Sequence, residues 1–457
     1  MKNLKYIIKL SYILIAIFIL GCEDNLELEP EQSLSPEIAT SSPANIQNIL
    51  IGIYNEAGQI ASYGGRINLA SELLANSGNL SWNGTFEQPA QLDEKQLVPD
   101  NTFVRDYWLN AYEVNNQANI VISSLDVFDD QTERDRVEGE TKFLRAMVYF
   151  DLARLFGQQY DPATTNSQLA APIVLDPVIN SSDITSPTRD SVEDVYARVI
   201  SDLTDAYNLL PASNGIFADR YAAQALLARV YLQQRNYAAA RDAANDVLQN
   251  SGHVLTTTYA AAFNNDGDSS EDIFAWQKTS QEAANSVNNM NTFWATRDFG
   301  GRSPTADVSI NVSFFAIFDD PTNDVRSQFF YNGNSVTTKW QSQFANIPFI
   351  RVAEMHLIRA EANFRLGTTI GLDPLAEINA LRGRSSATAL PSPLTLQNVV
   401  DERIRELSFE GFALHDIKRL EGTVGTLNFD DNFLVMPVPQ RERDANPNLD
   451  QNPGYGN

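Results

Sequence analysis

The chain has 457 residues, and its 58 acidic and 33 basic side chains give it a formal net charge of −25. Such acidity argues against nucleic acid and other polyanions as partners. Hydrophobic residues make up 43% of the sequence, which is enough for a large folded core. Because there is a single cysteine, no disulfide within the chain can contribute to stability.

The first 21 residues have the pattern of a signal peptide. Lysines precede a short apolar stretch from Leu10 to Leu20, and the only cysteine, Cys22, follows shortly after it. The stretch is too short to cross a bilayer, which needs ~20 apolar residues. Its Ile-Leu-Gly-Cys ending resembles a bacterial lipobox, so we expect residues 1–21 to be a lipoprotein signal peptide and Cys22 to be acylated. The alternative is an ordinary secretory signal with a chance cysteine.

Residues 22–45 are polar and rich in proline and serine, which predicts an extended tether. Helical periodicity then dominates to about residue 250. Apolar side chains recur three and four residues apart in 104–128, 133–157, 190–210 and 219–250. We expect residues 46–250 to form an N-terminal helical region.

The stretch Tyr221–Gln249 has the spacing of a tetratricopeptide helix pair, with small residues where two helices cross closely. Arg145–Phe150 repeats part of this pattern. A further pair is predicted at Arg351–Leu366 and Pro374–Arg384. Chance amphipathic helices are the alternative for any one segment, but the three together favour a mainly α fold built on a scaffold of tetratricopeptide-like helix pairs.

A loop-rich region is predicted for residues 251–345, which are rich in Asn, Ser, Thr, Gly and aromatic side chains. Ile273–Gln277 is predicted to be one of its few short strands. From Asn285 to Pro304 there is no clear period, and long irregular segments in a compact protein are usually functional or disordered. The density of aromatic side chains there argues against disorder.

Four separated motifs carry a resemblance to a known family. In chain order they are Phe143–Ala146 with Phe156 and Gly157, Ile350–Met355 with Arg359–Ala362, Glu402–Gly411 with Asp416–Arg419, and Met436–Gln440 with Asn446–Leu449 and Gln451–Tyr455. In this order, behind a lipobox-like leader, they closely resemble the SusD/RagB family of nutrient-binding outer-membrane lipoproteins.

The resemblance implies tetratricopeptide-like helix pairs combined with a more variable region. Residues 251–345 would then be the ligand platform, and 346–457 the C-terminal helical region. Members of this family cap a TonB-dependent transporter at the cell surface and capture glycans for import. The implied partners are such an outer-membrane transporter, an oligosaccharide or polysaccharide, and the outer membrane through a lipid anchor. The protein would face the cell exterior.

Eight charged residues lie within helical motifs among apolar neighbours. They are Arg145, Glu354, Arg359, Glu361, Glu402, Arg403, Glu406 and Glu410. Charges in such positions need partners, so we expect a paired, hydrogen-bonded network inside the scaffold rather than catalysis.

An enzyme is disfavoured by what the sequence lacks. The three histidines, His253, His356 and His415, have no metal-ligand spacing to one another. No Gly-rich phosphate loop follows a strand, and no G-x-S-x-G motif is present. Paired carboxylates could hydrolyse glycosides, but nothing marks a particular pair. We therefore predict a binding protein without catalytic residues, metal or cofactor.

A sugar-binding surface needs flat aromatic rings for stacking, with amides and charged groups beside them for hydroxyls. Two segments supply this mixture, Gly78–Gln88 and Asn288–Arg302. The predicted ligand-binding residues are Trp82, Asn83, Phe86, Trp294 and Arg297. For Trp82 and Trp294 the alternative is a ring packed on the scaffold. Packing is the preferred interpretation for the remaining tryptophans, Trp108, Trp276 and Trp340.

The sequence thus leaves two classes of function open. The first is a surface lipoprotein that binds glycan and delivers it to a transporter. The second is a helical-repeat adaptor that binds only protein partners. Within the first class, capture of a non-glycan nutrient such as peptide also remains open.

Overall fold

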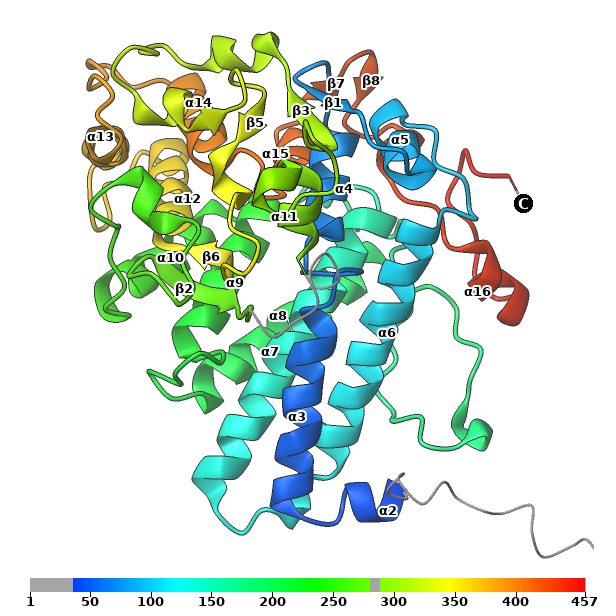
Figure 1. Ribbon diagram of the computed structural model, residues 1–457. Helices are drawn as coiled ribbons and strands as arrows, with labels where there is room; N and C mark the ends of the chain where they lie inside the picture. Colours follow the sequence, from blue (N-terminus) through cyan, green and yellow to red (C-terminus); the bar gives the residue numbers. More distant parts are fainter. Residues whose placement is uncertain (1–35, 280–287, 457) are drawn as a thin grey trace, which may run out of the picture.

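The computed structural model describes residues 36–279 and 288–456, and within them the protein is mainly helical, as predicted (Figure 1). The predicted signal peptide and Cys22 lie outside the described residues. The helices are α2 (Pro36–Ala39), α3 (Pro43–Ala57), α4 (Arg66–Leu74), α5 (Glu87–Glu94), α6 (Thr102–Ser123), α7 (Gln131–Phe156), α8 (Val192–Leu209), α9 (Arg220–Gln233), α10 (Tyr237–Asn250), α11 (Asn289–Trp294), α12 (Val352–Leu366), α13 (Pro374–Arg384), α14 (Leu396–Leu407), α15 (Ala413–Arg419) and α16 (Gln440–Ala445). None of these helices is both long enough and apolar enough to cross a membrane.

The prediction of an extended tether over residues 22–45 is wrong for its described part. Helix α2 begins at Pro36, and α3 begins at Pro43. The Ser42 side chain caps α3 by accepting a hydrogen bond from the backbone N–H of Asn45 at 3.3 Å. Proline and serine suggest an extended segment by composition, but they also suit the first turn of a helix.

The helical scaffold is built by packing neighbours in chain order. Helix α6 packs on α7, α7 on α8, α8 on α9 and α9 on α10 (Figure 1). The predicted helix pair within Tyr221–Gln249 is confirmed as α9 and α10, with Arg235 in the left-handed conformation between them. The pair at Arg351–Arg384 is confirmed as α12 and α13, and α12 packs against α10. Ala228 and Ala240 are both 0% exposed, as a close crossing of helices requires.

The strands form four separate two-stranded antiparallel pairs within the described residues. They are β1 (Leu80–Trp82) with β3 (Val308–Ile310), β2 (Asp272–Trp276) with β6 (Ile347–Arg351), β4 (Phe330–Tyr331) with β5 (Val336–Thr337), and β7 (Thr423–Val424) with β8 (Leu427–Asn428). The predicted strand at 273–277 is β2, within one residue. β1 and β6 were not predicted, because their partners lie far away in the sequence.

The charges within the helical motifs are paired inside the fold, as predicted. Five of the pairs are Arg145–Asp202 (2.8 Å), Glu354–Arg229 (2.8 Å), Arg359–Glu377 (2.6 Å), Glu361–Arg419 (2.8 Å) and Arg403–Asp416 (2.8 Å). Such buried pairs fix the relative positions of the helices that carry them.

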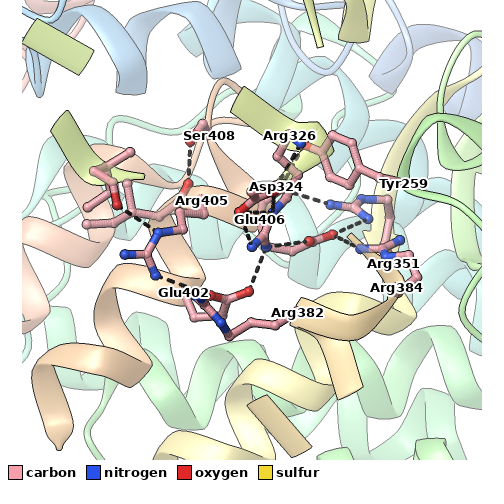
Figure 2. A network of polar contacts seen from close by, with 12 residues as sticks. Tyr259, Asp324, Arg326, Arg351, Arg382, Arg384, Glu402, Arg405, Glu406 and Ser408 are labelled. Atoms are coloured by element: carbon pink, nitrogen blue, oxygen red, sulfur yellow. Dashed lines mark hydrogen bonds and ion pairs between the residues drawn. The ribbon is translucent and has the colours of Figure 1, made fainter. Parts of the chain in front are cut away.

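The remaining charges form a larger network that joins the loop-rich region to α14 (Figure 2). Arg326, from the loop-rich region, lies 2.6 Å from Glu402 and 3.3 Å from Glu406. Arg351 and Arg384 also contact Glu406. Burial alone would raise the pKa of Glu406, but Arg384, Arg351 and Arg326 together hold it well below its usual range. The loop-rich region is therefore fixed to the scaffold by charge as well as by apolar packing.

Candidate functional site

The fold brings the two predicted sugar-binding segments together. β1 comes from the first segment and pairs with β3, which follows the second segment, so that Trp82 lies opposite Val308. Helix α11, within the second segment, packs against α4 and β3. Trp82 and Phe86 of the first segment therefore pack against the buried ring of Phe293 of the second.

The Trp82 ring is half-buried and held in one orientation. Its Nε1 donates a hydrogen bond to the backbone oxygen of Phe86 at 3.0 Å, and its ring meets Phe293 edge to face at 5.6 Å. A Cβ added at Gly84 would lie 2.3 Å from the Trp82 ring, so the turn between Trp82 and Phe86 needs glycine there. The chain thus presents an indole that is fixed before any ligand binds.

Phe86 is 39% exposed and supports an arginine. Its ring contacts Phe293 at 6.3 Å, while the guanidinium of Arg302 stacks on it 3.8 Å from the centroid. Arg302 is oriented by two further bonds, one to Asp307 at 2.8 Å and one to the hydroxyl of Thr85 at 3.0 Å. A stacked guanidinium of this kind keeps its remaining N–H groups at the surface, where they can donate to a ligand.

Asn83 is exposed beside Trp82. Its backbone N–H donates to the backbone oxygen of Asp307 at 2.7 Å, and its amide nitrogen donates to the hydroxyl of Ser309 at 2.7 Å. These bonds fix the side chain through its nitrogen and use no acceptor capacity of Oδ1. An amide held in this way can accept a hydrogen bond from a ligand hydroxyl.

Arg297 is exposed at the start of a short 3-10 helix and donates to the backbone oxygen of Arg302 at 3.2 Å. The neighbouring Phe299 is 44% exposed and meets the ring of Tyr331 edge to face at 5.3 Å. Arg302, Phe299 and Tyr331 were not among the predicted site residues. Arg302 could have been chosen from its segment, but Tyr331 comes from β4 and carries no local signal.

Trp294 occupies a different position from the one predicted. It is 0% exposed, and its ring packs against Phe409 at 5.3 Å. Its ring therefore offers no face to a ligand in this structure, and the packing alternative describes it. Consecutive residues of a helix point about 100° apart, so α11 directs Phe293 toward Trp82 and Trp294 toward the core. Trp108, Trp276 and Trp340 are also buried, as predicted, which leaves Trp82 as the one tryptophan of five that is not.

A third guanidinium lies behind this surface. Arg66 stacks 4.1 Å from the centroid of Phe103, whose ring contacts both Phe86 and Phe293. Burial lowers the pKa of Arg66, and the pairing with Asp106 at 3.1 Å opposes that shift. Arginine is protonated at neutral pH even when its pKa is lowered in this way, so Arg66 contributes positive charge beneath the rings.

We name the surface formed by Trp82, Asn83, Phe86, Arg297 and Arg302 the β1 platform. It combines a fixed indole, an amide and two guanidinium groups. Such a surface suits a hydroxyl-rich ligand that stacks on a ring and exchanges hydrogen bonds around it. Among the described residues, no group of three or more His, Cys, Asp and Glu side chains could hold a metal ion.

Two family models match the chain and together span most of it. A model described as "Starch-binding associating with outer membrane" matches residues 24–232. A second model, described as "SusD family", matches residues 216–434.

Individual relatives agree with these models. The chain is 24% identical to SusD-like protein P2 of Formosa agariphila over 98% of this chain and 99% of that protein. It is 32% identical to the starch-binding protein SusD of Bacteroides thetaiotaomicron, over 24% of this chain and 22% of that one. Its fold is similar to that of a SusD superfamily protein from B. thetaiotaomicron, with a TM-score of 0.80, 24% identity and coverage of 90% of this chain and 100% of the other. A putative sugar-binding protein from Bacteroides vulgatus gives a TM-score of 0.79 with 24% identity, over 91% of this chain and 99% of the other.

Proposed function

This chain belongs to the SusD/RagB family, and we propose that it is a surface lipoprotein that binds oligo- or polysaccharide and delivers it to a partner TonB-dependent outer-membrane transporter. Support for the ligand class comes from the starch-binding relative and from the description of the first family model. The same description, association with the outer membrane, supports the location.

The observation that carries the proposal is the β1 platform. Trp82 is held by a hydrogen bond and by Phe293, so little side-chain freedom is lost when a ligand stacks on it. Asn83 follows it in the chain, Arg302 stacks on the neighbouring Phe86, and Arg297 contacts the backbone of Arg302, so the platform offers donors and acceptors for hydroxyl groups. The net charge of −25 disfavours polyanions at long range, while the local positive charge of the two arginines still allows neutral or weakly acidic sugars to bind.

A binding role also agrees with the use of the charged motif residues. Glu402, Glu406 and Glu410 are 9% exposed or less and are engaged by arginine or lysine side chains. Carboxylates held in this way stabilise the scaffold and are not available as a general acid and base for a surface ligand.

The anchor completes the proposal. Cys22 ends a lipobox-like leader, and acylation there would hold the folded body at the outer face of the outer membrane. Several acyl chains contribute ~0.8 kcal/mol per buried methylene, so the attachment would be stable where a single myristoyl chain is marginal.

Calorimetry with a panel of oligosaccharides, maltooligosaccharides included, tests the ligand site. We expect Trp82→Ala to weaken binding about ten- to hundred-fold, on the scale of ~1–3 kcal/mol known for bases stacked on aromatic rings. Phe86→Ala is expected to weaken it as well, since Arg302 loses its support. Phe433→Ala is the matched control, because Phe433 is 40% exposed and Phe86 is 39% exposed.

The outcomes separate the alternatives. Wild-type affinity in both platform variants, with unchanged melting temperature, would place the glycan site elsewhere. Binding of peptides but of no glycan would favour a peptide nutrient. A chain that binds neither, yet captures its transporter, would be the adaptor of the second class.

A further inference from the structure

A second recess is lined by residues of α4, α14 and α15 and by Leu80 of β1. Its volume is about 320 Å³, and none of the five platform residues is among its walls. Most of the wall surface is apolar, and its larger side chains include Leu80, Phe314, Ile404, Leu407, Phe409 and Phe412. Ile404 is 39% exposed at the mouth, while Phe409 is buried. The recess is therefore an apolar cavity that opens to the surface.

Two buried arginines, Arg403 and Arg419, line this cavity. Arg403, on α14, is 3% exposed, and its Nε donates to both carboxylate oxygens of Asp416, at 2.8 and 3.0 Å. Its Nη1 is buried and has no hydrogen-bond partner in the described part of the chain. A buried donor without a partner is destabilising, and more so when it is charged. This edge of the Arg403 guanidinium therefore lacks an acceptor among the described residues.

The charges around Arg403 favour an anionic acceptor. Asp416 is shared with Arg419 at 2.7 Å, and Arg419 also pairs with Glu361 at 2.8 Å. Glu361 is in turn shared with Arg365 at 2.8 Å. These five side chains hold three guanidinium groups and two carboxylates, which leaves one positive charge in excess.

Glu72 is the other acid in the cavity wall. Burial raises its pKa to about 7, so a large fraction of it is neutral at pH 7. Its oxygen Oε1 accepts a hydrogen bond from the backbone N–H of Gly411 at 2.8 Å. It therefore adds less negative charge to the cavity than an exposed glutamate would.

We propose that this cavity binds a small carboxylate with an apolar body, with the carboxylate on Nη1 of Arg403 and the body between Phe409 and Ile404. The volume suits a molecule of roughly ten heavy atoms, since it equals the share of about ten waters in the liquid and lies at the lower end for ligand pockets. An apolar body suits the cavity better than a sugar, because most of the wall surface is apolar and hydroxyls placed against it would lack partners.

Two probes of the same body test the proposal on the mature wild-type chain. Calorimetry and saturation-transfer NMR measure the binding of 3-phenylpropionate and of 3-phenylpropan-1-ol. The two molecules share the same phenylpropyl body and differ only in their terminal group, which is a carboxylate in the first and a neutral hydroxyl in the second. The acid is expected to bind at least ten-fold more tightly. Equal affinity for the two, or binding of neither up to ~10 mM, would overturn the proposal.

Variants then assign the site. Arg403→Gln should abolish the preference for the acid, while Asp416 keeps Arg419 as a partner. Arg405→Gln is the matched control: Arg405 lies on the same helix, is 5% exposed, donates to the backbone oxygen of Ile317 at 2.7 Å and does not line the cavity. It should leave both affinities unchanged.

A third variant protects the test against misfolding. Val400 is half-buried in the cavity wall, and Val400→Phe fills the cavity without altering a charge. It should abolish binding of the acid even if Arg403→Gln does not fold. Unchanged binding in a folded Val400→Phe protein would place the probe elsewhere and refute the proposal.

Discussion

Glu72 shows how one buried acid can limit stability. It lies on α4 at 5% exposure, and burial raises its pKa to about 7, although backbone N–H groups of Gly411 and Ala413 oppose the shift. Because the folded pKa exceeds the ordinary glutamate value of 4.5, the folded state binds more protons than the unfolded state between those two values. The stability that neutral Glu72 contributes is present below pH 4.5 and is lost as pH rises through 7.

We therefore expect Glu72→Gln to raise the free energy of unfolding relative to wild type, and to do so more at pH 8 than at pH 5. Glutamine keeps an acceptor for the N–H of Gly411 and cannot ionise. Relative to wild type, the free energy of unfolding should rise by up to about 3 kcal/mol between the two pH values, since one pKa unit corresponds to 1.36 kcal/mol. Urea unfolding at both pH values measures this. The exposed Glu94 on α5 provides the control, Glu94→Gln. If the difference in unfolding free energy between Glu72→Gln and wild type is the same at both pH values, the raised pKa of Glu72 is refuted.

Among single residues, Trp82 and Trp294 show which features of the site could be predicted from the sequence and which could not. Both lie in aromatic, amide-rich segments without helical period, so the sequence gives them the same interpretation. The difference is decided by distant contacts: Trp294 meets Phe409 of the C-terminal region, whereas Trp82 lies over its own turn. A local sequence pattern carries no information about which residues, distant in the sequence, will contact a given side chain in the fold.

Helices were the most predictable elements. The predicted ranges for α6 to α10, α12 and α13 agree with the structure to within a few residues, because amphipathic periodicity is a local property. The short strands were mostly missed, since β1 and β6 are defined by partners far away in sequence. The start of α3 was misassigned from composition, which describes residue types and not caps.

Close helix packing gives a test at the level of elements. Ala228 is 0% exposed on α9, which packs against both α8 and α10. Ala228→Trp would overpack this crossing, at a cost of roughly 1–3 kcal/mol or more. Thermal and urea unfolding would measure the loss. Ala238→Trp, on the exposed face of α10, is the matched control and should cost little. Equal stability of the two variants would mean that the α9 packing described here is wrong.

At the scale of the whole molecule, the local character of a segment was easier to predict than its contacts with distant segments. The described residues of 251–345 are loop-rich, and the ion pairs of Arg326 with Glu402 and Glu406 join them to α14. The β1 platform draws on the N-terminal region as well as on this one, since Trp82 and Phe86 precede α6. The sequence could assign each segment a character, but only the pairing of β1 with β3 shows that they share one surface.

The anchor is a property of the whole chain, because it decides where the folded body works. If Cys22 is the acylated residue, Cys22→Ser leaves the body intact and removes its attachment, so the protein should move from the membrane fraction to the soluble fraction. Fractionation with high-salt and carbonate washes measures this, and Glu23→Gln is the control that keeps the cysteine. Cys22→Ser should also retain wild-type affinity for the glycan in solution, since the β1 platform lies wholly in the folded body. A Cys22→Ser protein that stays membrane-bound after both washes would show that attachment does not depend on this cysteine.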